Sequence, residues 1–129
     1  MIALPDYDKW IESEYKLSET YFERGYAYCI LGMYDEAIKD YTKSIDLDDS
    51  QKMTYNNRAF SYYQQNKYKE AISDYDKAIK FDATYADAYT SRGMDKYKSD
   101  DKKGACKDWD KAIELNYQKA QGFKDKYCN

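Results

Sequence analysis

The chain has 129 residues, of which 21 are basic and 24 acidic, and its net charge of -3 comes without any block of lysines or arginines. This length suits one domain with a useful core, and the charge balance argues against a nucleic-acid partner, because phosphate neutralisation supplies most of that affinity. Histidine is absent, so the usual general base and the imidazole metal ligand are both missing.

The first element that we expect is a helix within residues 1–17. Pro5 suits the first turn of a helix, and apolar residues follow it at helical spacing. No apolar run here is long enough for a signal peptide or a membrane span, which favours a cytoplasmic protein. The helix could end at a turn near residues 16–18, where Ser18 can cap the next helix, or it could run on unbroken. We favour the turn.

One motif recurs along the rest of the chain. It begins as YDEAIKDY at Tyr34, returns as YKEAISDY at Tyr68, and returns again, more altered, as KKGACKDW at Lys102, so the interval is 34 residues. A fragment, DYDKWI, begins at Asp6 in the same register. A constant interval without insertions indicates a stacked array of one supersecondary unit. The period therefore predicts an all-α solenoid.

Each unit is predicted to hold two helices joined by a short turn. The turns are expected at Gly32-Met33, Asn66-Lys67 and Asp100-Asp101, and the second helix opens directly after each of them. The tail places Phe123 where the earlier units have tyrosine, so it can serve as a closing helix. The predicted divisions of this single domain are an N-terminal half-repeat helix at 1–17, full units at 18–51, 52–85 and 86–119, and a C-terminal capping helix at 120–129.

Within the units, small residues and aromatic rings recur at fixed places. The chain here resembles the tetratricopeptide repeat family, although the proline usual near the end of that repeat is absent, with Asp49, Ala83 and Tyr117 in its place. The resemblance implies a right-handed superhelix whose concave face is lined by the first helix of each unit. The matching residues are Tyr21, Gly25, Tyr28, Tyr34, Ala37, Tyr41 and Ser44 in the first unit, Tyr55, Ala59, Tyr62, Tyr68, Ala71, Tyr75 and Ala78 in the second, and Tyr89, Gly93, Ala105, Trp109 and Ala112 in the third.

A polar pair is repeated in each unit. An arginine precedes an aspartate by sixteen residues, and this spacing holds in all three units. We expect each aspartate to accept hydrogen bonds from an arginine of its own or the following unit, in a partly buried pair. The alternative, a row of arginines that binds phosphate, is disfavoured because each arginine is accompanied by an aspartate in the same unit. The pairs are Arg24 with Asp40, Arg58 with Asp74, and Arg92 with Asp108.

Residues for catalysis or for metal binding are scarce. No phosphate-binding glycine loop or nucleophile motif occurs, and the acidic run at 46–50 starts like a calcium loop but lacks its central glycine and distal glutamate. The three cysteines are odd in number and show no CxxC spacing, which argues against a disulfide framework and for a reducing compartment. Cys29 and Cys106 are interpreted as packing residues, and Cys128 as the one candidate reactive thiol. We expect no enzyme, no cofactor and no metal.

The resemblance implies that the first helices form a groove for a protein or peptide partner. Apolar rings and amides recur there, although ordinary helix packing could also explain some of them. Amides can hydrogen-bond an extended backbone while rings supply apolar pockets, so we expect an extended or helical peptide with few charges. The predicted partner-binding residues are Phe22, Tyr26, Asn56, Asn57, Phe60, Tyr63, Thr90, Met94 and Tyr97.

One branch of the family holds the C-terminal carboxylate of chaperones with lysine, asparagine and arginine side chains. The corresponding residues here are Phe22, Tyr26, Asn57, Asp87 and Ser91, of which only Asn57 fits. The resemblance therefore implies a scaffold or adaptor without that clamp. A self-association module that exchanges its N-terminal half-repeat, giving a homodimer, is the alternative, and an RNA reader is disfavoured by the negative net charge.

Overall fold

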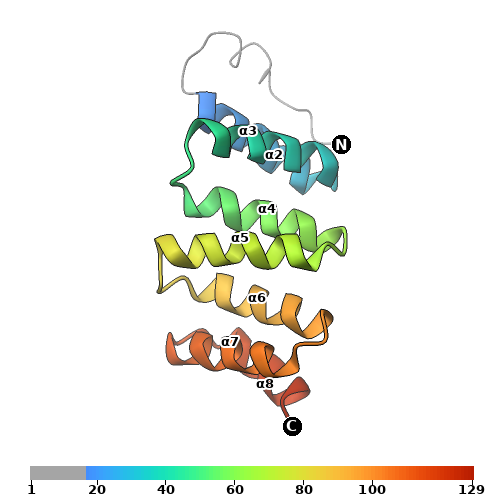
Figure 1. The fold of residues 1–129 in the computed structure, drawn as a ribbon, viewed down its shortest axis with the longest axis vertical. Coiled ribbons are helices and arrows are strands. Elements are labelled where there is room, and N and C mark those ends of the chain that lie inside the picture. The colour runs from blue at the N-terminus through green and yellow to red at the C-terminus, as the bar shows by residue number, and fades with distance from the viewer. Residues whose placement is uncertain (1–16) are drawn as a thin grey trace.

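The computed structural model describes residues 17–129. In this part of the chain only α-helices and turns occur, and the helices stack one after another along a single axis (Figure 1). The all-α helical repeat predicted from the 34-residue period is confirmed. The helices are α2 (Leu17–Ile30), α3 (Tyr34–Leu47), α4 (Lys52–Gln64), α5 (Tyr68–Phe81), α6 (Ala86–Lys98), α7 (Lys102–Glu114) and α8 (Lys119–Tyr127).

The expectations for the N-terminal half-repeat fall on residues outside this described part. These are the helix within 1–17, the choice between a turn and a continuous helix, and the exchange of that helix between two chains. Ser18 lies inside α2, where its hydroxyl donates to the Ser44 carbonyl at 2.9 Å. The boundaries between the units stay predictions.

The turn inside each helix pair has one residue in the left-handed region of the backbone. Gly32, Asn66 and Asp100 occupy it, with φ of 75°, 60° and 72°. The N–H of the next residue then donates back to a carbonyl five residues earlier, as from Lys67 to Tyr62 at 2.9 Å, which closes the helix end. Glycine, asparagine and aspartate tolerate this conformation best. The turns predicted at these three places are confirmed.

Aspartate, in the absence of proline, ends the second helix of the first two pairs. Asp48 and Asp82 adopt extended backbone conformations. Asp48 accepts from the N–H and the hydroxyl of Ser50 at 3.1 and 2.6 Å, and Asp82 does the same with Thr84 at 3.0 and 2.7 Å. Such turns hold the chain away from a helical path. The acidic run at 46–50 is therefore a helix end.

The helices of one pair meet where small residues face rings. A Cβ added at Gly25 would lie 3.0 Å from the Tyr41 ring, and one added at Gly93 would lie 2.6 Å from Nε1 of Trp109. Tyr41, Tyr75 and Trp109 are all buried at this place in their pairs. Close approach of two helices requires small residues at the crossing, and the rings fill the space around it.

The predicted arginine–aspartate pairs all form, each within its own helix pair. Every arginine donates through Nε and one terminal nitrogen to both oxygens of its aspartate, at 2.7 to 2.8 Å. Two of them also reach the preceding pair, because Arg58 donates to the Thr42 hydroxyl at 3.1 Å and Arg92 to Asp76 at 2.8 Å. The pairs thus join helices within a unit and link neighbouring units.

The cysteine expectation needs a correction. Cys106 on α7 and Cys128 just after α8 form a disulfide, with their Cα atoms 5.9 Å apart. The interpretation of Cys106 as a plain packing residue and of Cys128 as a reactive thiol was wrong. An odd number of cysteines leaves one unpaired, and that one is Cys29. The disulfide fastens the C-terminal helix to the last full pair.

Candidate functional site

The first helices of successive pairs lie next to one another along one face. α4 contacts α2 on one side and α6 on the other, in addition to its own partner α5. Some side chains on the shared face of these three helices remain exposed. Tyr26 on α2 is 51% exposed and Phe60 on α4 is 43% exposed. We call this face the groove along α2, α4 and α6, and all nine residues predicted to bind a partner lie on these three helices.

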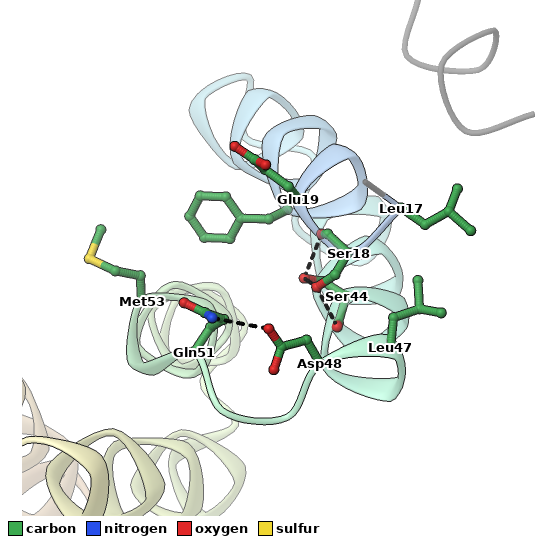
Figure 2. Close-up of a pocket in the computed structure, with 9 residues that line it drawn as sticks. Leu17, Ser18, Glu19, Ser44, Leu47, Asp48, Gln51 and Met53 are labelled. Carbon is green, nitrogen blue, oxygen red and sulfur yellow. Dashed lines mark hydrogen bonds between the residues drawn. The ribbon is translucent and has the colours of Figure 1, made fainter. Parts of the chain in front are cut away.

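At the N-terminal end of the groove, Phe22 stacks on Tyr26 with ring centroids 6.5 Å apart and lies 5.8 Å from the Tyr41 ring. Phe22 also lines a cavity of about 690 Å³ between α2, α3 and the start of α4 (Figure 2). In that cavity Ser18 and Ser44 bond to each other, and Gln51 donates to Asp48 at 3.0 Å. Leu17, the first described residue, lines it too, so this cavity lies at the edge of the described structure.

Asn56 and Asn57 occupy the middle of the groove and are half-buried. Among the described residues, Oδ1 of Asn56 is buried without a hydrogen-bond partner. The Asn57 amide lies beside the buried Tyr41 hydroxyl: burial raises the pKa of Tyr41, and the Asn57 amide lowers it in part. Buried polar atoms without partners are uncommon. The two amides therefore lie in the middle of the groove, with these atoms below its surface.

A smaller cavity of about 230 Å³ lies farther along the groove. Helices α4, α5, α6 and α8 all contribute to it, so segments far apart in the sequence meet here. Four of the predicted groove residues, Phe60, Tyr63, Thr90 and Met94, lie together in its wall. The other lining residues are Tyr75, Asp87, Ser91, Asp95, Lys119 and Phe123.

Asp95 is the unusual member of this cavity. Its side chain is fully buried, with 0% exposure, and neither carboxylate oxygen has a hydrogen-bond partner in the part of the chain that the structure describes. Burial raises the pKa of the Asp95 carboxyl to about 8. The same burial raises the pKa of Tyr75, and the nearby Asp95 charge raises it further. A carboxyl placed in this way holds its proton at neutral pH.

Two of the predicted groove residues, Thr90 and Tyr97, also have structural roles. Thr90 is buried, and its hydroxyl donates to the Ala86 carbonyl at 3.0 Å. Its carbonyl accepts from Nε1 of Trp109 at 3.1 Å. Tyr97 packs away from the other groove residues, with its ring 4.4 Å from Tyr127 and 6.2 Å from Trp109. The structure brings Phe60, Tyr63, Thr90 and Met94 together and places Tyr97 in the C-terminal core.

Sequence reasoning missed Asp95, Tyr75, Lys119 and Phe123 as parts of this cavity. A signal for Asp95 was present, because the equivalent residues of the first two units are the small Ala27 and Ser61. A charged residue at a place that otherwise holds small side chains contradicts the packing pattern. The contribution of α8 had no such signal, since it depends on how the tail folds back.

Within residues 17–129, no group of three or more histidine, cysteine, aspartate or glutamate side chains could hold a metal ion. Among the same residues, none of the helices is long and apolar enough to span a membrane.

Comparison with known proteins identifies the fold family. A family model described as tetratricopeptide repeat matches residues 18–51, and one described as TPR repeat matches residues 61–94. No curated protein matches the chain.

Solved structures agree with these matches. The first TPR of Spaghetti (RPAP3) bound to the HSP90 peptide SRMEEVD is 30% identical, covers 81% of this chain and 90% of its own, and superposes with a TM-score of 0.74. The Arabidopsis OM64 TPR domain is 27% identical over 85% of this chain and 93% of its own, with a TM-score of 0.82. The second TPR domain of human RPAP3, in complex with an HSP70 peptide, is 27% identical over 78% and 92%, with a TM-score of 0.71. The chain belongs to the tetratricopeptide repeat family.

Proposed function

We propose that this chain is a non-enzymatic adaptor whose groove along α2, α4 and α6 binds an extended or helical peptide segment with few charges. The observation that carries the proposal is the row of partly exposed rings, Tyr26 and Phe60 above all, beside the half-buried amide side chains of Asn56 and Asn57. Apolar side chains gathered on one face commonly mark an interaction site. Amide side chains can bond a peptide backbone whatever its sequence.

The structural relatives support a peptide as the kind of partner. The RPAP3 domains were solved with peptides of HSP90 and HSP70, and these domains share 30% and 27% identity with this chain. The sequence of this chain argues for a different peptide, because Asp87 and Ser91 stand where the carboxylate-binding branch of the family has basic residues. We therefore propose a partner without an acidic C-terminal tail.

The charge balance supports a protein partner over a nucleic acid. The chain carries a net charge of -3, and its arginines Arg24, Arg58 and Arg92 are held by aspartates. A phosphate backbone would need these guanidinium groups free. Binding to RNA or DNA, if tested, should be absent at physiological salt.

A displayed library of random peptides, selected on the purified chain, tests the proposal. We expect selected peptides to bind Phe60→Ala and Asn57→Ala about 5- to 150-fold more weakly, which corresponds to about 1 to 3 kcal/mol. Lys39→Ala and Lys80→Ala, on the exposed faces of α3 and α5, are the matched controls and should bind as the wild type does. Helicity by circular dichroism should be unchanged in all four variants.

Two outcomes would contradict the proposal. If no peptide is selected, the groove does not function as a peptide site. If peptides are selected but bind Phe60→Ala and Asn57→Ala with wild-type affinity, the interface lies on the other face or at the ends of the array.

A further inference from the structure

We propose that the cavity around Asp95 binds one basic side chain, lysine or arginine, of the peptide that occupies the groove. The inference rests on the proposed function, because the peptide delivers the basic side chain. It adds a chemical requirement that the family resemblance does not contain.

The first argument is the state of the Asp95 side chain. It is completely buried, and both of its oxygens lack a partner on the protein. Buried carboxyl groups are normally paired with a cation or satisfied by several donors, because burial without a partner is costly. The equivalent residues, Ala27 and Ser61, show that the fold does not need an acid here. An unsatisfied buried acid in the wall of a cavity leaves open the place of a hydrogen-bonding or charged partner.

The second argument is the size and lining of the cavity. About 230 Å³ is less than most small-molecule sites occupy, but it suits a single long side chain. Rings of Phe60, Tyr63, Tyr75 and Phe123 line it, contributed by α4, α5 and α8. Aromatic faces attract cations, and they also cover the aliphatic stem of a lysine or arginine. The lining therefore suits a cationic head on an apolar stem.

The third argument is the charge around Asp95. On its own helix Asp87 lines the same cavity and is exposed, while Arg92 and Lys96 are both held by Asp108 of α7. From α8, Lys119 reaches the cavity but is exposed and makes no bond to Asp95. Tyr63 and Tyr75 line the cavity from α4 and α5. Among residues 17–129 no neighbour neutralises Asp95, so that role is open to a partner.

The protonation state of the free protein fits this assignment. Since burial raises the pKa of Asp95 to about 8, the empty cavity holds a neutral acid at pH 7. An incoming lysine or arginine favours the carboxylate, so the proton leaves to solvent as the ion pair forms. Binding of a basic peptide should then become tighter as the pH rises toward 8 and level off above it.

Selection of the same random peptide library on wild type, Asp95→Asn and Asp46→Asn tests the inference. We expect wild type to select lysine or arginine at one peptide position and Asp95→Asn to lose only that preference. Asp46→Asn removes the same charge from an exposed place on α3 and should select as wild type does. If the asparagine of Asp95→Asn disturbs folding, Asp95→Ser provides a second variant, because serine is the equivalent residue, Ser61, of the second unit.

A pH series on one selected peptide completes the test. Replacing its basic residue with norleucine should weaken binding to wild type at least tenfold at pH 8 and leave binding to Asp95→Asn unchanged. Wild-type affinity for the basic peptide should rise by up to tenfold per pH unit between 6 and 8.

The outcomes separate the two proposals. Selected peptides without a basic preference, or with the same preference in Asp95→Asn, would overturn the role of Asp95 and leave the groove intact. A library that yields no peptide at all would instead overturn the proposed function.

Discussion

The central core and the C-terminal core are built at equivalent places of the repeat but are completed differently. The central core gathers Tyr55 and Tyr75 with alanines from α4, α5 and α6, and a full helix pair follows it. The C-terminal core has Trp109 where the other has Tyr75, and within residues 17–129 the short α8 covers it. Phe123 and Tyr127 of α8 stack on Trp109 at 5.7 and 5.8 Å. Larger rings thus fill the C-terminal core.

The connections that lead into these two cores differ as well. Asp82, before α6, is extended and bonds to Thr84, whereas Asn116, before α8, has φ of 67°. Asn116 therefore forms the tight turn otherwise found inside a helix pair, with Tyr117 N–H donating to the Ala112 carbonyl at 3.0 Å. Gln118 stands where Thr84 does and cannot form the hydroxyl bond. One changed turn and one disulfide thus distinguish the connection to α8 from the connection to α6.

The largest expected effect concerns the arginine–aspartate pairs of the two regions. We expect Asp74→Ala to lower the free energy of unfolding by about 3 to 5 kcal/mol, because the mostly buried Arg58 loses its carboxylate. Asp108→Ala also releases the partly exposed Lys96, but it should cost less, about 1 to 3 kcal/mol, since Arg92 keeps Asp76 at 2.8 Å. Urea unfolding measures both. Equal losses would contradict this difference.

The disulfide should matter next, and only in the C-terminal region. It closes a separation of 22 residues, so we expect reductant or Cys128→Ser to cost about 3 kcal/mol. Thermal unfolding with and without reductant measures this, and Cys29→Ser is the control because Cys29 is free. A melting temperature that reductant leaves unchanged would contradict the expectation.

The disulfide also bears on where the protein resides. The cytoplasmic location stays a proposal, and disulfides persist mainly in oxidising compartments. Thiol labelling of the protein from its native cells tests it. One labelled cysteine would argue against the cytoplasm, and three would support it.

The repeat pattern was sufficient to predict the arrangement of the helices. The helices, their turns and the arginine–aspartate pairs followed from the 34-residue period, because a repeated residue meets the same neighbours in each unit. The turns at Gly32, Asn66 and Asp100 were predicted from the repeat, and the structure shows that these residues adopt the left-handed conformation that they tolerate well. Local chemistry and periodicity therefore predicted the fold.

Features that break the period could not be predicted in this way. The bond between Cys106 and Cys128 depends on how α8 folds back, and an odd count of cysteines concealed it. The cavity around Asp95 needs side chains from four helices, including Phe123 of α8. The groove rings were predicted from one helix face at a time. Features that several units form together could be identified only from the structure.

A smaller effect should distinguish the two glycines that contact rings. We expect Gly93→Ala to cost about 2 kcal/mol, because the added Cβ would overlap Nε1 of Trp109 and disturb its bond to Thr90. Gly25→Ala should be nearly neutral, since the Tyr41 contact is looser and alanine gains about 1 kcal/mol of helix propensity. Ala59, the equivalent residue of the second unit, already packs in the central core. Thermal unfolding measures both variants, and equal effects would contradict the difference.

The smallest effect is a pH dependence of stability. We expect it in the C-terminal region, where Asp95 stands at the place that Ser61 occupies in the central unit. The pKa of Asp95 is about 8 in the folded chain, above the ordinary value near 3.9 expected after unfolding, so the folded state binds the extra proton between these values. Stability should therefore fall as the pH rises from 4 to 8 and stay level above 8. The fall cannot exceed about 1.4 kcal/mol per pH unit, because one proton is exchanged.

Replacing Asp95 with serine, the residue of the central unit, should remove this slope and raise stability at pH 7. Asp87→Asn, which changes an exposed carboxylate beside the same cavity, is the matched control and should keep it. Urea unfolding at pH 5, 6, 7 and 8 measures the three proteins. Parallel profiles for wild type and Asp95→Ser would show that Asp95 is ionised in the folded chain and has found a partner there. In that case the difference between the two regions would lie in their rings, their turns and the disulfide alone.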